Sequence, residues 1–277
     1  MRTQAEKGEV FRALHERDGA FIIPNPWDAG SARLLALLGF EALATTSAGH
    51  AFSLGRLDNT LSREETVAHV AAIAAATDLP ASADLGNGFG DEPEDAAETI
   101  RLAGRAGLAG GSIEDFTQRH DDPVYPIEVA AERVRAAAEA AHSFPFPFLL
   151  TARAENYLLR RPDLRDTIRR LQAYQEAGAD VLYAPGLTSK DDIAAVVSSV
   201  DRPVNVIMGL QGVQLSLSEL AALGVKRVSV GSALSRAALG ALLGAAREMR
   251  EHGTFRFAED AVSYRDVSAM LAEVTRG

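Results

Sequence analysis

One phrase recurs along the chain: an amphipathic stretch, a glycine, and then a short apolar or β-branched run. It is seen in LLGFEALATTS, RAGLAGGSIED, EAGADVLYAPG and ALGVKRVSVGS. Each glycine occupies the place where a helix ends in a left-handed residue before the next strand begins. The apolar runs lack polar alternation, which is typical of parallel strands covered by helices on both faces. The four glycines are Gly39, Gly107, Gly178 and Gly224.

Eight such runs are found, and this number predicts a closed (β/α)8 barrel, or TIM barrel. A doubly wound open sheet is the alternative. The 277 residues suffice for one barrel, and no linker or low-complexity stretch divides them, so a single domain over 1–277 is expected. The predicted strands are Ala20–Pro24, Ala42–Thr46, Ala81–Asp84, Leu108–Glu114, Phe148–Arg153, Val181–Ala184, Val204–Met208 and Arg227–Gly231.

Helices are predicted between these strands, near residues 29–38, 63–77, 92–106, 126–141, 163–177, 189–199, 216–223 and 232–250. Ser62 with Glu65 and Ser216 with Glu219 have the spacing of capping boxes, which fixes two helix starts. An N-terminal helix and a C-terminal helical tail over Ala258–Val274 are expected outside the barrel. Four histidines on these helices or at their ends are expected to be solvated: His15, His69, His142 and His252.

The formal net charge is −10, which argues against a nucleic acid or an anionic membrane as partner. The chain has no cysteine, so disulfides, thiolate metal sites and a cysteine nucleophile are excluded. The N-terminal stretch is polar and lacks an apolar signal core, and the longest apolar runs are too short to span a bilayer. A soluble, cytoplasmic protein is therefore expected.

Polar residues gather after the predicted strands, where barrel enzymes carry their chemistry. Asp84 and Glu114 end the third and fourth strands, and Asp58 lies just beyond the second. Three carboxylates at neighbouring strand ends repel one another unless a cation lies between them. Oxygen ligands without histidine or cysteine favour Mg2+ first and Mn2+ second. The alternative is that these acids cap helices or bind arginines at the barrel rim.

Arg153 is the cation among these strand ends, and its planar pair of donors suits a substrate carboxylate. A structural partnership with Glu155 or Glu114 is the alternative, and the two roles are compatible. The small residues Thr46–Gly49 would let backbone N–H groups approach an oxyanion, although small residues also permit close packing.

The loop Phe116–Tyr125, after the fourth strand, is long enough to act as a lid. His120 lies within it and is a candidate proton donor, because histidine carries protons readily near neutral pH. Gln118 and Arg119 are the alternatives in the same loop, and His50 could reach the site from the loop after the second strand.

The motifs GFEALATTSAG, SLGRLD, SADLGNGFG, SIED, TARAEN and GADVLYAPG occur in this order. In the order and spacing of these motifs, the chain resembles the isocitrate lyase and phosphoenolpyruvate mutase superfamily from about Phe21 to about Gly231. The resemblance implies an enzyme that acts on small 2-oxo or 2-hydroxy acids with Mg2+ and an enolate-like intermediate. It also implies a homotetramer in which the last barrel helix packs on a neighbouring subunit.

By position, Asp84 resembles the direct metal ligand of that superfamily, while Asp58 and Glu114 resemble acids that hold the metal's waters. Thr46, Ser47 and Ala48 resemble the loop that binds substrate oxygens. The remaining correspondences are Trp27 as an aromatic wall, Arg153 as the grip on a substrate anion, and Glu155 and Asn205 near the substrate. Asp58, Arg153 and His120 are thus the candidate catalytic residues.

The chain departs from the superfamily pattern at three points. Gly86 stands where a second metal-site acid is frequent. The lid cysteine of the isocitrate and methylisocitrate lyases is missing, which argues against both activities. The lid FTQRHDDPVYP is also shorter than that of the phosphonate enzymes. The expectation is a carbon–carbon lyase or decarboxylase for an oxaloacetate- or 2-oxoglutarate-like acid. Phosphonopyruvate hydrolase or phosphoenolpyruvate mutase chemistry, or a non-catalytic 2-oxo acid-binding protein, are the alternatives.

Overall fold

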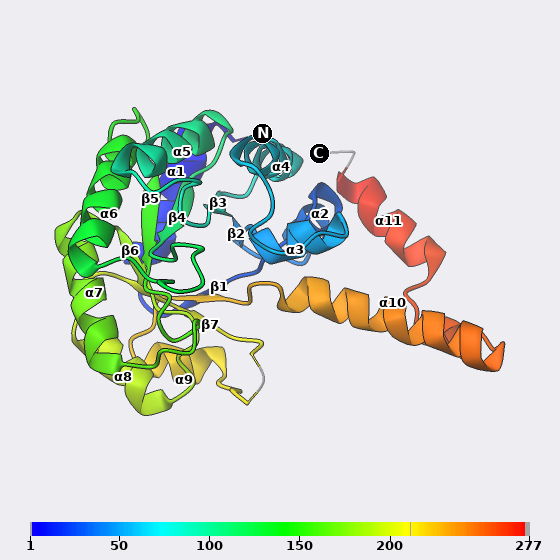
Figure 1. Ribbon diagram of the computed structural model, residues 1–277. Helices are drawn as coiled ribbons and strands as arrows, with labels where there is room; N and C mark the ends of the chain where they lie inside the picture. The colour runs from blue at the N-terminus through cyan, green and yellow to red at the C-terminus, as the bar shows by residue number, and fades with distance from the viewer. Residues whose placement is uncertain (1, 211, 275–277) are drawn as a thin grey trace.

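The computed structural model describes residues 2–210 and 212–274, and its strands form a nearly closed parallel barrel (Figure 1). Along the sheet the strands follow the order β1-β8-β7-β6-β5-β4-β3-β2. At the seam, the backbone N–H of Ala44 donates to the Pro24 carbonyl at 3.0 Å and links the ends of β1 and β2. The predicted (β/α)8 barrel is confirmed, and the open sheet is wrong.

All eight predicted strands are present, and most are a residue or two shorter at their ends than predicted. Ladder hydrogen bonds end there because the backbone turns away into the loops that form the rim. The strands are β1 (Phe21–Ile23), β2 (Leu43–Ala44), β3 (Ala81–Asp84), β4 (Gly110–Glu114), β5 (Leu149–Arg153), β6 (Val181–Tyr183), β7 (Val204–Ile207) and β8 (Arg227–Ser229).

The predicted helices are also present. They are α1 (Gln4–Glu16), α2 (Ala29–Leu37), α4 (Arg63–Ala76), α5 (Pro93–Arg105), α6 (Ile127–His142), α7 (Leu164–Glu176), α8 (Lys190–Ser198), α9 (Leu217–Ala222) and α10 (Ala233–His252). The tail contains the short 3-10 helix η1 (Arg256–Glu259) and α11 (Tyr264–Val274). One helix was not predicted, α3 (Ser47–Ser53), because its short, small-residue sequence shows no apolar period.

Local sequence signals fix the helix ends. Ser62 and Ser216 both form complete capping boxes, as predicted. The four glycines of the recurring phrase all have positive φ, reaching 103° at Gly178, where a side chain would be strained. The alternation of helix, glycine and strand therefore has a direct conformational cause, and it delivers each strand end to the same rim.

Helix α1 closes the lower end of the barrel, where Phe11 and Leu14 are buried against the strand residues Phe21, Ile23 and Leu149. His15, on the same helix, is 5% exposed, so its predicted solvation is wrong. Its Nδ1 lies 2.8 Å from the Phe11 carbonyl. Burial, and then the charge of Arg227, lowers the pKa of His15 to about 3, so this imidazole is neutral at physiological pH.

Arg227 is buried at the start of β8, above His15. Its guanidinium donates to Asn205 Oδ1 and Thr151 Oγ1, both at 2.9 Å, and Nη1 lies 3.4 Å from His15 Nε2. Within the part of the chain that the structure describes, no carboxylate pairs with it. Burial lowers the pKa of Arg227 to about 10, but the side chain stays charged near neutral pH. The barrel floor therefore holds a cation among neutral partners.

The second helical histidine that departs from the prediction is His69, which is half-buried and stacks on His50. Their ring centroids are 3.5 Å apart and the planes differ by 6°. Burial, followed by the charge of His50, lowers the pKa of His69 to about 4. The two neutral rings thus pack α3 against α4.

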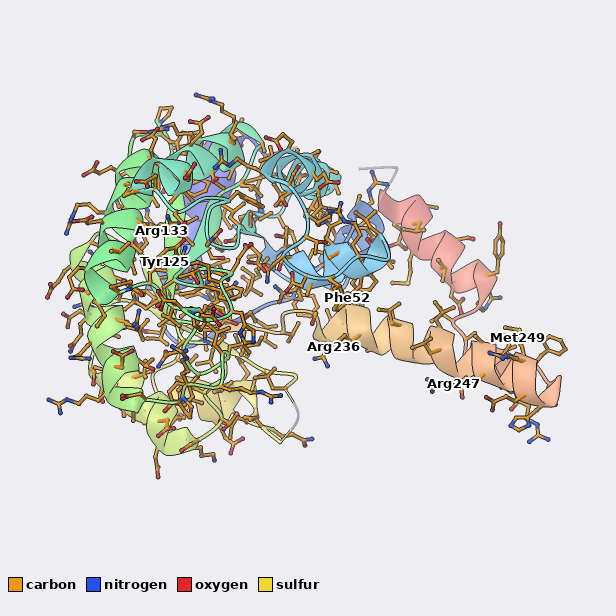
Figure 2. All side chains as sticks on the ribbon, in the orientation of Figure 1. Phe52, Tyr125, Arg133, Arg236, Arg247 and Met249 are labelled. Atoms are coloured by element: carbon orange, nitrogen blue, oxygen red, sulfur yellow. The ribbon has the colours of Figure 1, made fainter. Side chains whose placement is uncertain are left out.

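Helix α10 leaves the barrel and α11 folds back toward α2 (Figure 1). Of the side chains on α10, Ser235 is buried, while Leu242, Leu243 and Met249 are exposed. Figure 2 shows Arg247 and Met249 on the outer part of this helix. Across the described ranges, no helix combines the length and apolar character needed to cross a membrane.

Candidate active site

A cavity of about 290 Å³ opens at the carboxyl ends of the strands. Its walls come from all eight strands, β1 to β8, and from the start of α3, so residues far apart in the sequence converge there. The predicted site residues that line it are Thr46, Ser47, Ala48, Asp58, Asp84, Glu114, Arg153, Glu155 and Asn205.

Arg153 lies at the centre of this cluster, and each guanidinium nitrogen contacts a different carboxylate. Nε is 2.8 Å from Glu155, Nη1 is 2.9 Å from Asp84, and Nη2 is 3.1 Å from Glu114. The guanidinium also lies 5.3 Å from the ring centroid of Tyr183, within cation–π range. Arg153 is therefore held in one orientation by three elements of the rim.

Burial governs the electrostatics of this group. It raises the pKa of Glu114 and of Glu155, and the nearby Arg153 charge opposes that rise in both. Burial works against the Arg153 charge as well, but the charges of Glu155 and Glu114, with that of Asp84, raise its pKa overall. The guanidinium thus remains positive and is the principal counter-charge to the surrounding acids.

Asp84 joins this cluster to the start of α3. Its Oδ2 accepts a hydrogen bond from the Ser47 backbone N–H at 3.1 Å, and its own N–H donates to Thr45 Oγ1 at 2.9 Å. Thr46 caps α3 by accepting from the Gly49 N–H at 3.2 Å. The Ser47 amide at the start of α3 therefore faces the Asp84 carboxylate, where a helix N-terminus favours negative charge.

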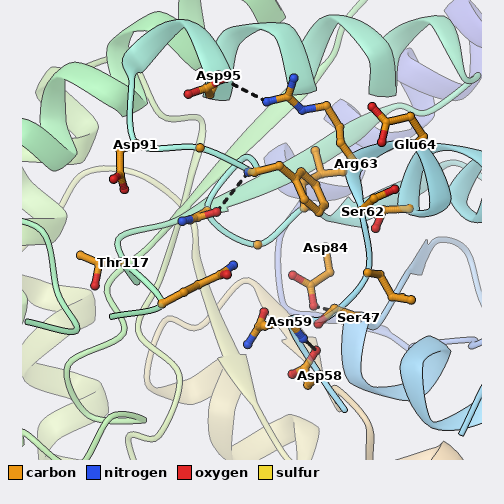
Figure 3. Close-up of a pocket in the computed structure, with 18 residues that line it drawn as sticks. Ser47, Asp58, Asn59, Ser62, Arg63, Glu64, Asp84, Asp91, Asp95 and Thr117 are labelled. Atoms are coloured by element: carbon orange, nitrogen blue, oxygen red, sulfur yellow. Dashed lines mark hydrogen bonds and ion pairs between the residues drawn. The ribbon is translucent and has the colours of Figure 1, made fainter. Parts of the chain in front are cut away.

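Asp58 approaches the same place from the loop after α3, beside Ser47 and Asp84 (Figure 3). Burial, and then the charge of Asp84, raises the pKa of Asp58, while a hydrogen bond with the Ser47 hydroxyl lowers it. Two carboxylates that face one cavity, with the charge of one raising the pKa of the other, are an arrangement that a cation would stabilise.

The donors around Asp58 and Asp84 fit Mg2+. Among the described residues, no three acidic, histidine or cysteine side chains are grouped so as to hold a metal ion. Mg2+ does not need such a cage, because it keeps several waters and is commonly held by one or two carboxylates. The residues that would hold it are Asp84 and Asp58, with all-oxygen ligands that suit a hard ion.

Two predicted site residues lie apart from this cavity. Trp27 is half-buried beside Gly49 and does not line it. His120 is fully exposed in the lid, 3.4 Å from Asp121. The lid itself lies close by, because Phe116 lines the cavity and Thr117 and Gln118 line its neighbour.

Sequence reasoning gave no role to several residues that complete the site. Asp115 accepts a hydrogen bond from the Glu155 N–H at 2.8 Å and pairs with Arg170 at 3.0 Å, which holds Glu155 toward Arg153. Tyr183 backs Arg153, and burial raises its pKa to about 12. Asp115 and Tyr183 both stand at predicted strand ends, but neither position alone shows which way a side chain points.

The chain matches the family model described as phosphoenolpyruvate phosphomutase over residues 11–250. Its fold resembles a crystal structure of a Burkholderia cenocepacia protein proposed to be a lyase or mutase, which is 64% identical with a TM-score of 0.95 and covers 97% of this chain and 96% of that one. An uncharacterised Mycobacterium tuberculosis protein is 32% identical over 242 residues, which are 87% of this chain and 89% of that protein.

Other relatives have named activities. The oxaloacetate decarboxylase of Chromohalobacter salexigens is 28% identical and covers 87% of this chain and 84% of the enzyme. A structure of phosphonopyruvate hydrolase with oxalate and Mg2+ is 25% identical, with a TM-score of 0.85, and covers 98% of this chain and 96% of that one. Lyases and mutases of this kind make up the superfamily. With its matched barrel and its strand-end motifs, this chain belongs to the phosphoenolpyruvate phosphomutase family, within the isocitrate lyase and phosphoenolpyruvate mutase superfamily.

Proposed function

We propose that the protein is a Mg2+-dependent carbon–carbon lyase or decarboxylase that acts on a small 2-oxo dicarboxylate of the oxaloacetate type. The observation that carries this proposal is the 290 Å³ cavity in which Arg153, Asp84 and Asp58 face the first turn of α3. Its size suits a four-carbon acid. The named relatives support the substrate class, since they include an oxaloacetate decarboxylase and an oxaloacetate acetylhydrolase structure that holds oxalate.

In this reaction the bond between C3 and C4 of the 2-oxo acid breaks and carbon dioxide leaves. The bonding electron pair moves toward the 2-oxo group and leaves an enolate, which takes up a proton at C3. Arg153 would bind a substrate carboxylate by exchanging one of its acidic partners for it, so the guanidinium stays paired throughout. Glu155 keeps it oriented, because Asp115 fixes the Glu155 backbone.

The first turn of α3 is placed to bind substrate oxygens as negative charge develops on them. Thr46, Ser47 and Ala48 line the cavity there, and the helix N-terminus favours an anion. A Mg2+ ion held by Asp84 and Asp58 would supply Lewis-acid polarisation of the same oxygens. Asn205 lines the inner wall, where its amide is oriented by Arg227 and Ser229.

The proton donor would come from the lid. We propose His120, which must move inward from its exposed position when the lid closes over the substrate. His120→Ala is then expected to lower turnover at least about tenfold, at the low end of general acid–base effects, with oxalate binding nearly unchanged. Steady-state kinetics on the true substrate check this result. Unchanged turnover would exclude His120 and leave Gln118 or Arg119.

The proposed function is tested by binding and turnover together. Oxalate with Mg2+ should raise the melting temperature, because a ligand that binds the native state alone must stabilise it. Oxaloacetate should then yield pyruvate and carbon dioxide. Release of phosphate from phosphonopyruvate would favour phosphonate chemistry instead. Tight binding of 2-oxo acids without turnover of any of them would identify a binding protein.

We further propose that the active protein is a homotetramer assembled through α10. The support is the helix itself, whose outer part exposes Leu242 at 61% and Leu243 at 51% while extending away from its own barrel. Exposed apolar side chains on such a helix are typical of an interaction site. Light scattering should give four times the mass of the 29.4 kDa chain, and a monomer in solution would refute the proposal.

A further inference from the structure

A second cavity, of about 640 Å³, adjoins the catalytic one. We propose that it is a chamber for a substituent on C3 of the substrate, and that it selects substituents that end in a neutral polar group over those that end in a further carboxylate. This inference rests on the proposed function, because it assigns the dicarboxylate head of the substrate to the smaller cavity.

The two cavities share one boundary. Ser47, Asp58, Asn59 and Asp84 line both of them. Figure 3 shows these four residues at one end of the larger cavity and the pair Arg63–Asp95 at the other. A ligand whose head lies between Asp84 and Arg153 can therefore extend a substituent past Asn59 into the chamber. A plain four-carbon acid would leave this space to water.

Gly86 opens the wall between the metal site and the chamber. A Cβ atom built on Gly86 would meet no atom within 4 Å, so the cavity wall has open space at this position. Its φ of 54° is a left-handed conformation, which asparagine and aspartate tolerate better than other side chains. The glycine thus leaves room in the wall of the chamber.

Backbone strain is concentrated around this space. Four non-glycine residues of the described chain have positive φ, and three of them line the chamber: Asn59 at 60°, Phe89 at 63° and Gln118 at 61°. Such conformations persist where the surrounding structure holds them, and they cluster at ligand sites. They come from three different loops, including the lid. The chamber is thus a shaped site rather than a gap between loops.

The chamber wall offers hydrogen bonds to a neutral polar group, while its charged side chains are mostly acids. Asn59 and Gln118 carry amides that can both donate and accept. Among the described residues that line it, Arg63 is the only basic one. Its Nη2 contacts Asp95 at 3.2 Å and the Gly88 carbonyl at 3.1 Å, while its Nε is buried without a hydrogen-bond partner. The other charged groups are acids, including Asp91 and Glu64.

A carboxylate that entered the chamber would meet mainly acids, and the Arg63 guanidinium there already contacts Asp95. These acids disfavour a further negative charge, whereas a neutral amide of the same shape is not repelled and can form hydrogen bonds with the wall. Selectivity would therefore arise mainly by rejection of the charged ligand.

The experiment uses three stable 2-hydroxy acids that share one head and differ at C3. Malate has no substituent, isocitrate carries a carboxymethyl group, and the isocitrate amide on that same arm carries the neutral isostere. Calorimetry with the whole protein and Mg2+ should give an amide affinity at least about tenfold above both malate and isocitrate. Oxalate, which is too small to reach the chamber, is the control for the head site.

Matched variants locate the effect. Leu61 lines the chamber but not the catalytic cavity. Leu61→Trp should fill the space and remove the advantage of the amide over malate, while Leu61→Met, of similar volume, should keep it. The comparison of the three ligands on the wild-type protein decides the question even if Leu61→Trp does not fold.

Two outcomes would overturn the chamber while the proposed function stands, because oxalate and Mg2+ would still bind. Equal affinities for malate and the amide would show that no substituent enters. A preference for isocitrate would show that Arg63 binds an anion there. Failure of oxalate to bind with Mg2+ would instead refute the proposed function and, with it, the proposed role of the chamber.

Discussion

Asp84→Asn should abolish the stabilisation of the protein by oxalate and Mg2+. At a ligand concentration one hundred times the dissociation constant, the wild-type protein should gain about 2.7 kcal/mol, or roughly 5–10 °C in melting temperature. The asparagine keeps the shape of Asp84 but lacks the negative charge, and Mg2+ has few other carboxylates in reach. Turnover should fall with binding.

The measurement is a thermal melt with and without oxalate, Mg2+ and a chelator. Asp260→Asn serves as the control, because it removes an exposed carboxylate far along the tail. Asp58→Asn should have a smaller effect than Asp84→Asn if Asp58 holds the metal's waters. A full oxalate and Mg2+ response in Asp84→Asn would show that the metal assignment is wrong.

Arg153→Met should lower the free energy of unfolding by about 3–5 kcal/mol, the usual cost of leaving buried charges without their partner. Three carboxylates, Asp84, Glu114 and Glu155, would then surround a side chain with no positive charge. Urea unfolding at neutral pH measures the loss. Arg153→Lys should be milder, because it keeps the charge but not the fork of donors, and should weaken oxalate binding by about 1.5–3 kcal/mol.

The effect of Arg153→Met should depend on pH. Glu114 and Glu155 already have raised pKa values in the fold, and loss of the guanidinium raises them further. A carboxyl with a raised folded pKa destabilises the fold above that pKa. This penalty fades as the pH falls toward the ordinary value of about 4.3. The difference between variant and wild type should therefore shrink on acidification; a difference that stays constant would show that packing, not charge, is lost.

Much of the barrel could be predicted because its signals are local. A glycine such as Gly178 must adopt positive φ where a helix ends, and a parallel strand must be apolar on both faces. Helix α3 escaped prediction because Ser47–Ser53 is short and its place depends on contacts with Asp84 and α4. Such a segment is helical by tertiary context rather than by its own periodicity.

The active site likewise has features that could be predicted from the sequence and features that could not. The strand-end acids and Arg153 could be located because the carboxyl ends of parallel strands share one rim. The simultaneous contacts of Arg153 with three acids could not be predicted from the sequence, because they depend on side-chain directions at the ends of β3, β4 and β5. His15 was expected in water because a helix outside the barrel repeat gave no sign of which face it buries. Its burial depends on the packing of α1 against the strands at the floor of the barrel.

That floor has a consequence for the amino-terminal segment. Helix α1 covers the end of the barrel that lies opposite the catalytic cavity. It places Phe11 in the interior and a neutral imidazole beneath the Arg227 charge. A chain trimmed to its first strand would admit water to an arginine whose remaining partners are neutral. That arginine lines the catalytic cavity and orients Asn205 there. Residues at the end of the barrel opposite the catalytic cavity therefore help to shield a side chain of the cavity wall from water.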